Sequence, residues 1–178
     1  MVKTTGEDVR IAPSAIIKVD ANAVIGSHVA IDHGFYCTTQ LLLGDYIHIA
    51  AYVTVTGGAG GMLIMRNFTT LAVGTRIHCV SDEHLGEGLV GPLILPLQRD
   101  RLHKGPVIIE TFAAVCTNAI LMPNVRILEG AVIGAGCLVP VDFVAQPWTI
   151  YVGNPIKALK KRPSDKMKRY AQELGYVI

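Results

Sequence analysis

The sequence has few aromatic and few charged side chains. Aromatic residues make up 6% of the chain and charged residues 17%, against 51% apolar residues, and the formal net charge is +2. A buried core must therefore be built from Val, Ile, Leu and Ala. Zinc-finger spacing and a series of aromatic residues suited to stacking on bases are both lacking, so the sequence does not predict a nucleic-acid-binding protein.

Long apolar runs and paired cysteines are also missing. No stretch approaches the ~18 apolar residues that a membrane-spanning helix needs, and no apolar run follows a basic start as in a signal peptide. The four cysteines, Cys37, Cys79, Cys116 and Cys137, are far apart and form no CxxC pair. This spacing favours reduced thiols over a disulfide framework. We therefore expect a cytoplasmic protein without a membrane span.

The sequence does have a six-residue repeat. Aliphatic positions recur every six residues in two stretches, from Val19 to Val55 and from Ile109 to Val139. Each is followed four residues later by a small or apolar residue, and the last of these in the N-terminal stretch is Ala59. An earlier step ends at Ile17, where a two-residue slip joins the next phase.

This period predicts stacked triangular coils. A short strand and a tight turn use about six residues, so three units close a coil of about 18 residues, with the aliphatic residue inside and its small partner at the bend. A β-sandwich fits less well, because its turns come every ~8–12 residues and irregularly. We expect an all-β, parallel β-helix.

The repeat fails between Gly57 and Pro106. A glycine-rich stretch comes first, and Phe68 and Ile77 then indicate at least one more, distorted coil. Residues 81–105 are rich in Gly, Pro and charged residues, which is typical of a long structureless loop. Such an insertion in a strict scaffold is usually functional, so we expect the active-site and substrate loop here.

The C-terminal residues predict a short helix. Ser164 is a suitable N-cap, and Met167, Tyr170, Ala171 and Leu174 have rough helical spacing. This helix would cover the open end of the β-helix, whose unpaired backbone needs protection. We divide the chain into a β-helix domain over 1–155, with the loop insertion at about 79–106, and a basic segment with the helix over 156–178.

Three motifs resemble a known family, the hexapeptide-repeat acetyltransferases of the maltose and galactoside acetyltransferase type. The motifs are Asn118–Val125, Glu129–Gly136 and Val152–Lys157. Residues 81–89 and 104–107 resemble a sugar-acetyltransferase subgroup of polysaccharide gene clusters, and the overall resemblance extends over most of the chain. The resemblance implies a left-handed β-helix, a homotrimer with active sites between subunits, acetyl-CoA as donor, and direct transfer to a sugar with a histidine as base. One departure is Pro140-Val141-Asp142 where the family often has Thr-Lys-Asp, so a lysine that the family can use near the cofactor is missing.

Acyl transfer needs a base for the acceptor proton and donors for the oxyanion. His84 is the first candidate base, because Asp82 or Glu83 beside it could fix its tautomer. His78, after Ile77, is the second candidate. Asp82 could orient a histidine or bind the sugar. The alternative roles are an exposed loop histidine for His84, a partly buried structural residue for His78 and a turn residue for Asp82.

Cofactor contacts are expected on coils that match the family's donor groove. Ala114, Thr117, Ala135 and Gly136 would let the pantetheine arm approach backbone amides, although coil packing explains small residues equally well. Lys157 and Lys160, in a basic C-terminal cluster, could meet the CoA phosphates or be ordinary solvated surface.

Two other functions stay open at this point. A γ-carbonic-anhydrase-like protein needs three converging histidines on zinc; His28 and His33 have a suggestive spacing, but no third ligand can be placed, so no metal is predicted. A noncatalytic β-helix scaffold or sugar-binding module is disfavoured by the inserted loop and the acetyltransferase-like ending. O- or N-acetylation of a surface-polysaccharide or nucleotide-linked sugar is the favoured activity.

Overall fold

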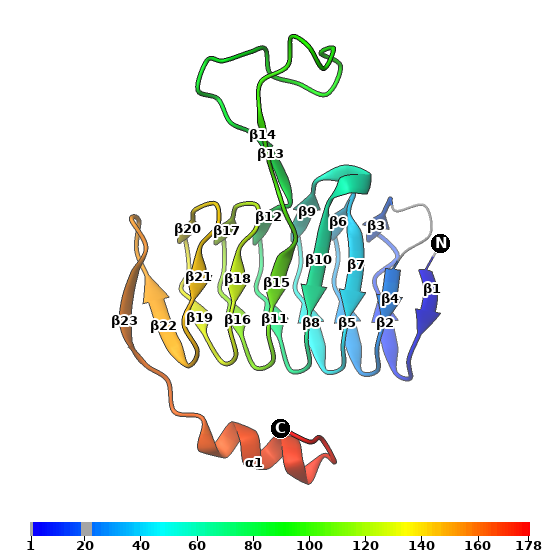
Figure 1. Cartoon of the computed structure of the whole chain (residues 1–178). Helices are drawn as coiled ribbons and strands as arrows, with labels where there is room; N and C mark the ends of the chain where they lie inside the picture. Colours follow the sequence, from blue (N-terminus) through cyan, green and yellow to red (C-terminus); the bar gives the residue numbers. More distant parts are fainter. Residues whose placement is uncertain (1, 19–22) are drawn as a thin grey trace.

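The protein is an elongated stack of triangular coils, seen here in a computed structural model that describes residues 2–18 and 23–178 (Figure 1). Each side of the triangle is one sheet of parallel strands, and we name the three sides sheets A, B and C. Sheet A contains β1 (Val2–Thr5), β4 (Ala23–Ile25), β7 (Gln40–Leu43), β10 (Met62–Met65), β15 (Val107–Ile109), β18 (Arg126–Ile127) and β21 (Val144–Ala145).

The other two sides follow the same order along the stack. Sheet B contains β2 (Val9–Ile11), β5 (Val29–Ile31), β8 (Ile47–Ile49), β11 (Thr70–Leu71), β16 (Ala114–Val115), β19 (Val132–Ile133), β22 (Thr149–Val152) and the antiparallel β23 (Lys157–Lys161). Sheet C contains β3 (Ile16–Ile17), β6 (Tyr36–Cys37), β9 (Thr54–Thr56), β12 (Arg76–His78), β17 (Ile120–Leu121) and β20 (Leu138–Val139). The predicted β-helix is confirmed.

Both positions of the repeat fill the interior. Ile109, Ile127 and Ile133 are fully buried, and so are the small residues Ala113 and Ala131, which follow the turns. Small side chains are needed there because the chain bends inward toward the axis of a narrow triangle. Val19 of the predicted series lies outside the described residues.

The coil from Leu63 to Ile77 is regular, so the predicted distortion is wrong. Thr69 and Thr75 take its small positions, and their hydroxyls donate to backbone oxygens at 2.8 Å, which satisfies these buried polar groups. Four extra residues before this coil shift its phase, because Leu43 pairs with Met65, 22 residues on. Ala59 is accordingly exposed in the short helix η1 (Gly58–Gly60) and is not part of the core.

Aromatic side chains form a ladder along the edge where sheet A turns into sheet B. Tyr46, Phe68 and Phe112 all have positive φ at the same corner of successive coils, and their rings stack with centroids 5.1 and 5.3 Å apart. The next coil has Gly130, also at positive φ, and a Cβ there would lie 2.3 Å from the ring of Trp148. Gly130 thus allows Trp148 to extend the ladder.

The C-terminal helix α1 (Asp165–Glu173) lies along this edge, and the prediction that it covers the open end is wrong (Figure 1). It begins after Ser164, as predicted, but the Ser164 side chain makes no capping bond. The end of the stack is covered by β23, which pairs with β22. Tyr176 explains the position of α1, because its ring packs edge-on against Tyr46 and Phe68 and its hydroxyl donates to Asp45 Oδ2 at 2.9 Å.

No helix among residues 2–18 and 23–178 is both long enough and apolar enough to cross a membrane.

Candidate active site

The long insertion leaves the β-helix where sheet C turns into sheet A, between β12 and β15 (Figure 1). It is not structureless, because β13 (Val80–Asp82) and β14 (Leu102–Lys104) pair antiparallel, with Ser81 opposite His103. This two-stranded stem carries a head in which several apolar side chains are exposed. The most exposed are Leu85, Leu93, Leu95 and Leu97, at 73%, 95%, 69% and 96%.

His78 lies at the foot of the insertion, at the end of β12. Its Nδ1 is 3.0 Å from Thr56 Oγ1, and the Thr56 hydroxyl is 3.4 Å from the backbone oxygen of Ile77. If the hydroxyl donates to that oxygen, it accepts from Nδ1–H, and the Nε2 lone pair of His78 is free. Burial lowers the pKa of His78, and the nearby charge of Arg76 lowers this pKa further. His78 is therefore neutral near pH 7, as a general base must be.

The other candidates of the insertion are separated along it. Asp82, at the end of β13, accepts from Arg99 Nε and Nη2 at 3.3 Å each, and both side chains are mostly buried. Glu83 faces His103 with 3.7 Å between Oε1 and Nε2. His84 is exposed at the start of the head, with φ of 58°. Sequence reasoning missed Arg99, because it is 17 residues from Asp82 in the chain and lies beyond the paired strands, so only the fold of the head brings the two side chains together.

The predicted cofactor residues lie on the C-terminal coils. Thr117, Ala135 and Gly136 share the edge where sheet B turns into sheet C, and Gly136 N donates to Thr117 O at 2.9 Å. A Cβ on Gly136 would meet nothing within 4 Å, so a ligand can approach this backbone closely. Ala114 lies on β16, half-buried, apart from that edge. Their role in binding stays a prediction.

The two predicted lysines are on β23. Lys157 pairs with Val152 and Lys160 with Ile150, and both side chains are exposed at the C-terminal end of sheet B. They are placed to meet an anion beyond the last coil, and their role also stays a prediction.

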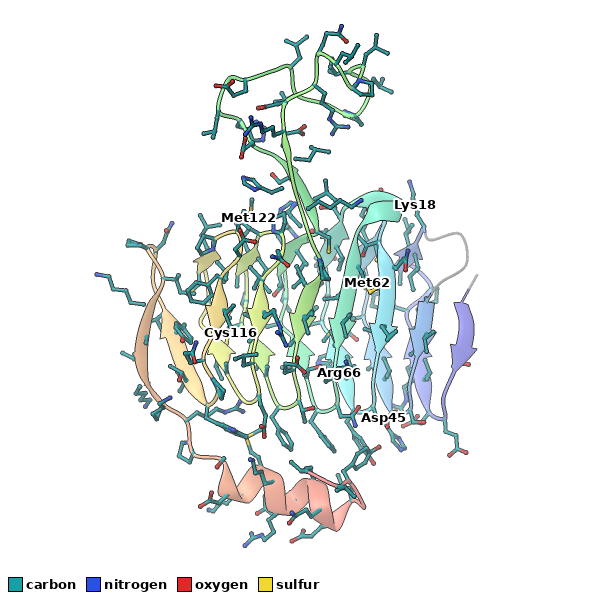
Figure 2. The ribbon with its side chains drawn as sticks, viewed as in Figure 1. Lys18, Asp45, Met62, Arg66, Cys116 and Met122 are labelled. Carbon is teal, nitrogen blue, oxygen red and sulfur yellow. The ribbon has the colours of Figure 1, made fainter. Side chains whose placement is uncertain are left out.

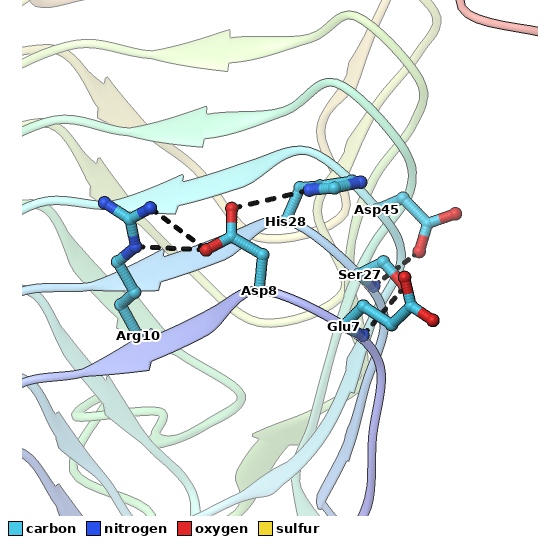
Figure 3. Close-up of polar contacts among 6 residues, drawn as sticks. All are labelled: Glu7, Asp8, Arg10, Ser27, His28 and Asp45. Atoms are coloured by element: carbon cyan, nitrogen blue, oxygen red, sulfur yellow. Dashed lines mark hydrogen bonds and ion pairs between the residues drawn. The ribbon is translucent and has the colours of Figure 1, made fainter.

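The histidines considered for zinc have other partners. His28 Nδ1 is 3.5 Å from Asp8 Oδ2, and Asp8 also accepts from Arg10, as Figure 3 shows. Both contacts lower the pKa of Asp8, with Arg10 the larger cause. His33 contacts the Ser14 hydroxyl at 3.1 Å. Within the described ranges no group of three or more His, Cys, Asp or Glu side chains could hold a metal ion.

Comparison with known proteins gives the family. The chain is 30% identical over 165 residues, 90% of its own length and 82% of the relative's, to dTDP-4-amino-4,6-dideoxy-D-glucose acyltransferase of Escherichia coli. It therefore belongs to the hexapeptide-repeat, left-handed β-helix acyltransferases, and it is an acyltransferase that uses acyl-CoA. The predicted family, fold and enzyme class are confirmed. No protein-family model matches the chain.

Solved structures agree. A substituted form of AntD, an N-acyltransferase from Bacillus cereus in complex with dTDP-4-amino-4,6-dideoxyglucose and coenzyme A, has a TM-score of 0.89 at 31% identity and covers 97% of this chain and 90% of AntD. AntD has also been solved with dTDP and 3-hydroxybutyryl-CoA, with a TM-score of 0.88 at 29% identity and coverage of 97% and 89%. A maltose O-acetyltransferase from Clostridium difficile 630 shares the fold, with a TM-score of 0.58 at 18% identity over 84% of this chain and 70% of the other.

Proposed function

We propose that this enzyme transfers an acyl group from acyl-CoA to the amino group of a nucleotide-linked amino-deoxy sugar of the dTDP-4-amino-4,6-dideoxyglucose type. The observation that carries the proposal is the similarity to AntD and to the Escherichia coli enzyme along nearly the whole chain. Acetyl-CoA is the proposed donor, and 3-hydroxybutyryl-CoA, which AntD binds, is the donor to compare with it. The acylated sugar would serve a surface polysaccharide made from cytoplasmic precursors.

His78 is the proposed general base. As the sugar amine attacks the thioester carbonyl carbon, Nε2 takes a proton from the nitrogen, and the carbon–sulfur bond of the tetrahedral intermediate then breaks to release the CoA thiolate. The thiolate regains a proton, from His78 or from water. Backbone amides at Thr117 and Ala135, on the proposed donor side, would hold the cofactor and stabilise charge on it. The Gly136 amide donates to Thr117 O, so the proposed part of Gly136 is to leave room for the pantetheine arm.

Asp82 is proposed to bind the sugar. Arg99 holds its Oδ1, which leaves Oδ2 to accept from a substrate hydroxyl or amine. Ala114, Ala135, Lys157 and Lys160 remain the proposed donor-side residues, with the lysines near the CoA phosphates.

We also propose a homotrimer in which the hairpin reaches a neighbouring subunit. The exposed leucines of the head support this, because a large exposed apolar patch is typical of a contact surface. His84, exposed at the head, would then enter a neighbour's cleft, and it is the second candidate base.

The test measures thiol release with each acyl-CoA against dTDP-4-amino-4,6-dideoxyglucose, the free amino sugar and a hydroxyl sugar. Wild type, His78→Gln, His84→Gln and the control His48→Gln are compared, with sedimentation to give the oligomeric state. We expect turnover on the nucleotide-linked amino sugar and a kcat loss of about 10²–10⁴-fold in His78→Gln only. Loss confined to His84→Gln would move the base to the hairpin, and no thiol release with any amino sugar would overturn the proposed function.

A further inference from the structure

The outer face of sheet C differs from the other two in its charge. Its strands direct two rows of side chains outward, and within them are two cations and no carboxylate. The rows are Ile16, Tyr36, Thr54, Arg76, Ile120 and Leu138, and then Lys18, Thr38, Thr56, His78, Met122 and Pro140. An anionic ligand would meet no like charge along this face.

Arg76 is held in place without being neutralised. Its Nη1 donates to the backbone oxygen of Tyr52 at 2.9 Å, and its side chain is exposed. By contrast, Arg10 on sheet B and Arg126 on sheet A each form an ion pair with a carboxylate. Among the described residues, Arg76 has no such partner within 4.0 Å, so its positive charge and its remaining N–H donors face solvent.

An aromatic and cationic pair lies farther toward the N-terminal end of the same face. The Lys18 Nζ is 5.3 Å from the centroid of the Tyr36 ring, which is half-buried on β6. Figure 2 shows Lys18 at the same edge of the β-helix as Met122, with the root of the hairpin between them.

The spacing suits a nucleotide sugar. Arg76 and His78 project from one face of β12 two residues apart, about 7 Å, and Tyr36 is two strands away from Arg76, about 10 Å. The first separation runs along the strand and the second across the strands, so the three positions form a right angle at Arg76, which suits a base, a diphosphate and a sugar with a bend at the diphosphate. The strands on the other side of β12 carry Ile120 and Leu138, which suit the uncharged pantetheine arm that would come from the proposed donor edge.

We infer that the N-terminal half of the outer face of sheet C binds the nucleoside diphosphate of the acceptor, with Arg76 on the diphosphate and the Lys18–Tyr36 pair at the base. The inference rests on the proposed function and deepens it, because it makes Arg76 the residue that selects nucleotide-linked over free sugars. The sugar then extends from the diphosphate toward His78.

Binding of dTDP alone tests the inference without any transfer chemistry. Calorimetry compares wild type, Arg76→Gln, Arg76→Lys and the control Arg10→Gln, which removes another exposed guanidinium, from sheet B. We expect the Kd for dTDP to rise about 10- to 100-fold in Arg76→Gln, as for loss of a charge-assisted hydrogen bond, and less in Arg76→Lys. Arg10→Gln should bind as wild type does, and the Kd for CoA should not change in any variant.

The outcomes separate the two proposals. The inference would be overturned if wild type binds dTDP and Arg76→Gln, with an unchanged melting temperature, binds it equally well. The proposed function would then still stand. A further variant, Tyr36→Leu, should weaken dTDP binding about 5- to 50-fold through loss of stacking, and unchanged binding would place the base elsewhere. Wild type that binds CoA but neither dTDP nor the nucleotide sugar would overturn the proposed acceptor, and the inference with it.

Discussion

Two edges of the triangular stack have opposite properties. The edge between sheets A and B turns in the same way in every coil and carries the aromatic ladder. Within residues 2–18 and 23–178, the insertions that depart from the 18-residue coil lie at the edge between sheets C and A (Figure 1). One departure follows β3, where Thr5 pairs with Ile25, twenty residues on; the second contains η1, and the third is the hairpin.

The difference shows how a repeat tolerates a functional insertion. A stacked coil needs each strand above its neighbour, so extra residues are harmless only where they loop outward and return to the same register. After the hairpin this register is kept, because Leu63 pairs with Val107 and Ile77 pairs with Leu121. The edge of sheets A and B has no such freedom, since rings at its successive turns pack on one another from Tyr46 to Phe112, and Trp148 continues the ladder past Gly130.

Deletion of residues 80–105 should have the largest effect on activity. Joining Cys79 to Pro106 restores the six-residue spacing from Ile77 to Ile109, so we expect a folded protein with a melting temperature close to that of wild type. The deletion removes Asp82, Arg99 and His84 together. Because these residues are proposed to position the substrate, we expect kcat/KM to fall by more than about 10³-fold. Thermal unfolding and thiol release check the two parts, and a deletion variant that fails to fold would contradict the tolerance argued for this edge.

Gly130→Val should be the most damaging single change at the ordered edge. The new side chain would collide with Trp148 at a position where φ is +66°, so we expect a loss of about 2–4 kcal/mol in the free energy of unfolding. The matched change is Gly58→Val in η1, where φ is +61° and a Cβ would meet nothing within 4 Å. Backbone strain alone should cost it about 1–2 kcal/mol, and equal losses in a urea titration would remove the distinction between the edges.

The pH dependence of activity sharpens the assignment of His78. The pKa of His78 is lower in the folded protein than in the unfolded chain, so the unfolded chain binds the proton more tightly. The contribution of neutral His78 to the free energy of unfolding is therefore present at neutral pH, and it is lost as pH falls below the usual histidine pKa of about 6.5. The acid limb of kcat/KM should accordingly lie below pH 6.5. Thr56→Val should move the limb, and Thr56→Ser should restore it. An acid limb that is unchanged in Thr56→Val would show that a group other than His78 titrates there.

Tyr176→Phe should have the smallest effect. Burial and the bond to Asp45 raise the pKa of Tyr176 to about 12, so its contribution is present below the ordinary value near 10 and is lost as pH rises from there toward 12. We expect the variant to lose about 0.5–1.5 kcal/mol at neutral pH and to lack that alkaline decline. Hydrogen exchange of α1 measures both effects, and an unchanged exchange rate would show that the ring contacts alone hold the helix.

The sequence determined the repeat, and with it the β-helix, because burial in a narrow triangle demands an aliphatic residue every six positions and a small one at each bend. It also placed the insertion and named His78, Asp82 and His84, since the longest interruption of the period is rich in glycine, proline and charged residues. The coil from Leu63 to Ile77 escaped prediction because a four-residue shift and two buried threonines conceal its phase.

Only the tertiary structure decided which side chains meet. The pairing of Asp82 with Arg99 depends on how the head folds back on the stem, and the contact of His78 with Thr56 joins residues 22 apart in the chain. The helix α1 follows the aromatic ladder and does not cover the end of the stack, because stacked rings at positive-φ turns form an apolar surface that appears only once the coils are aligned. Local periodicity specifies the coil, whereas contacts between coils arise from the registers that the insertions set.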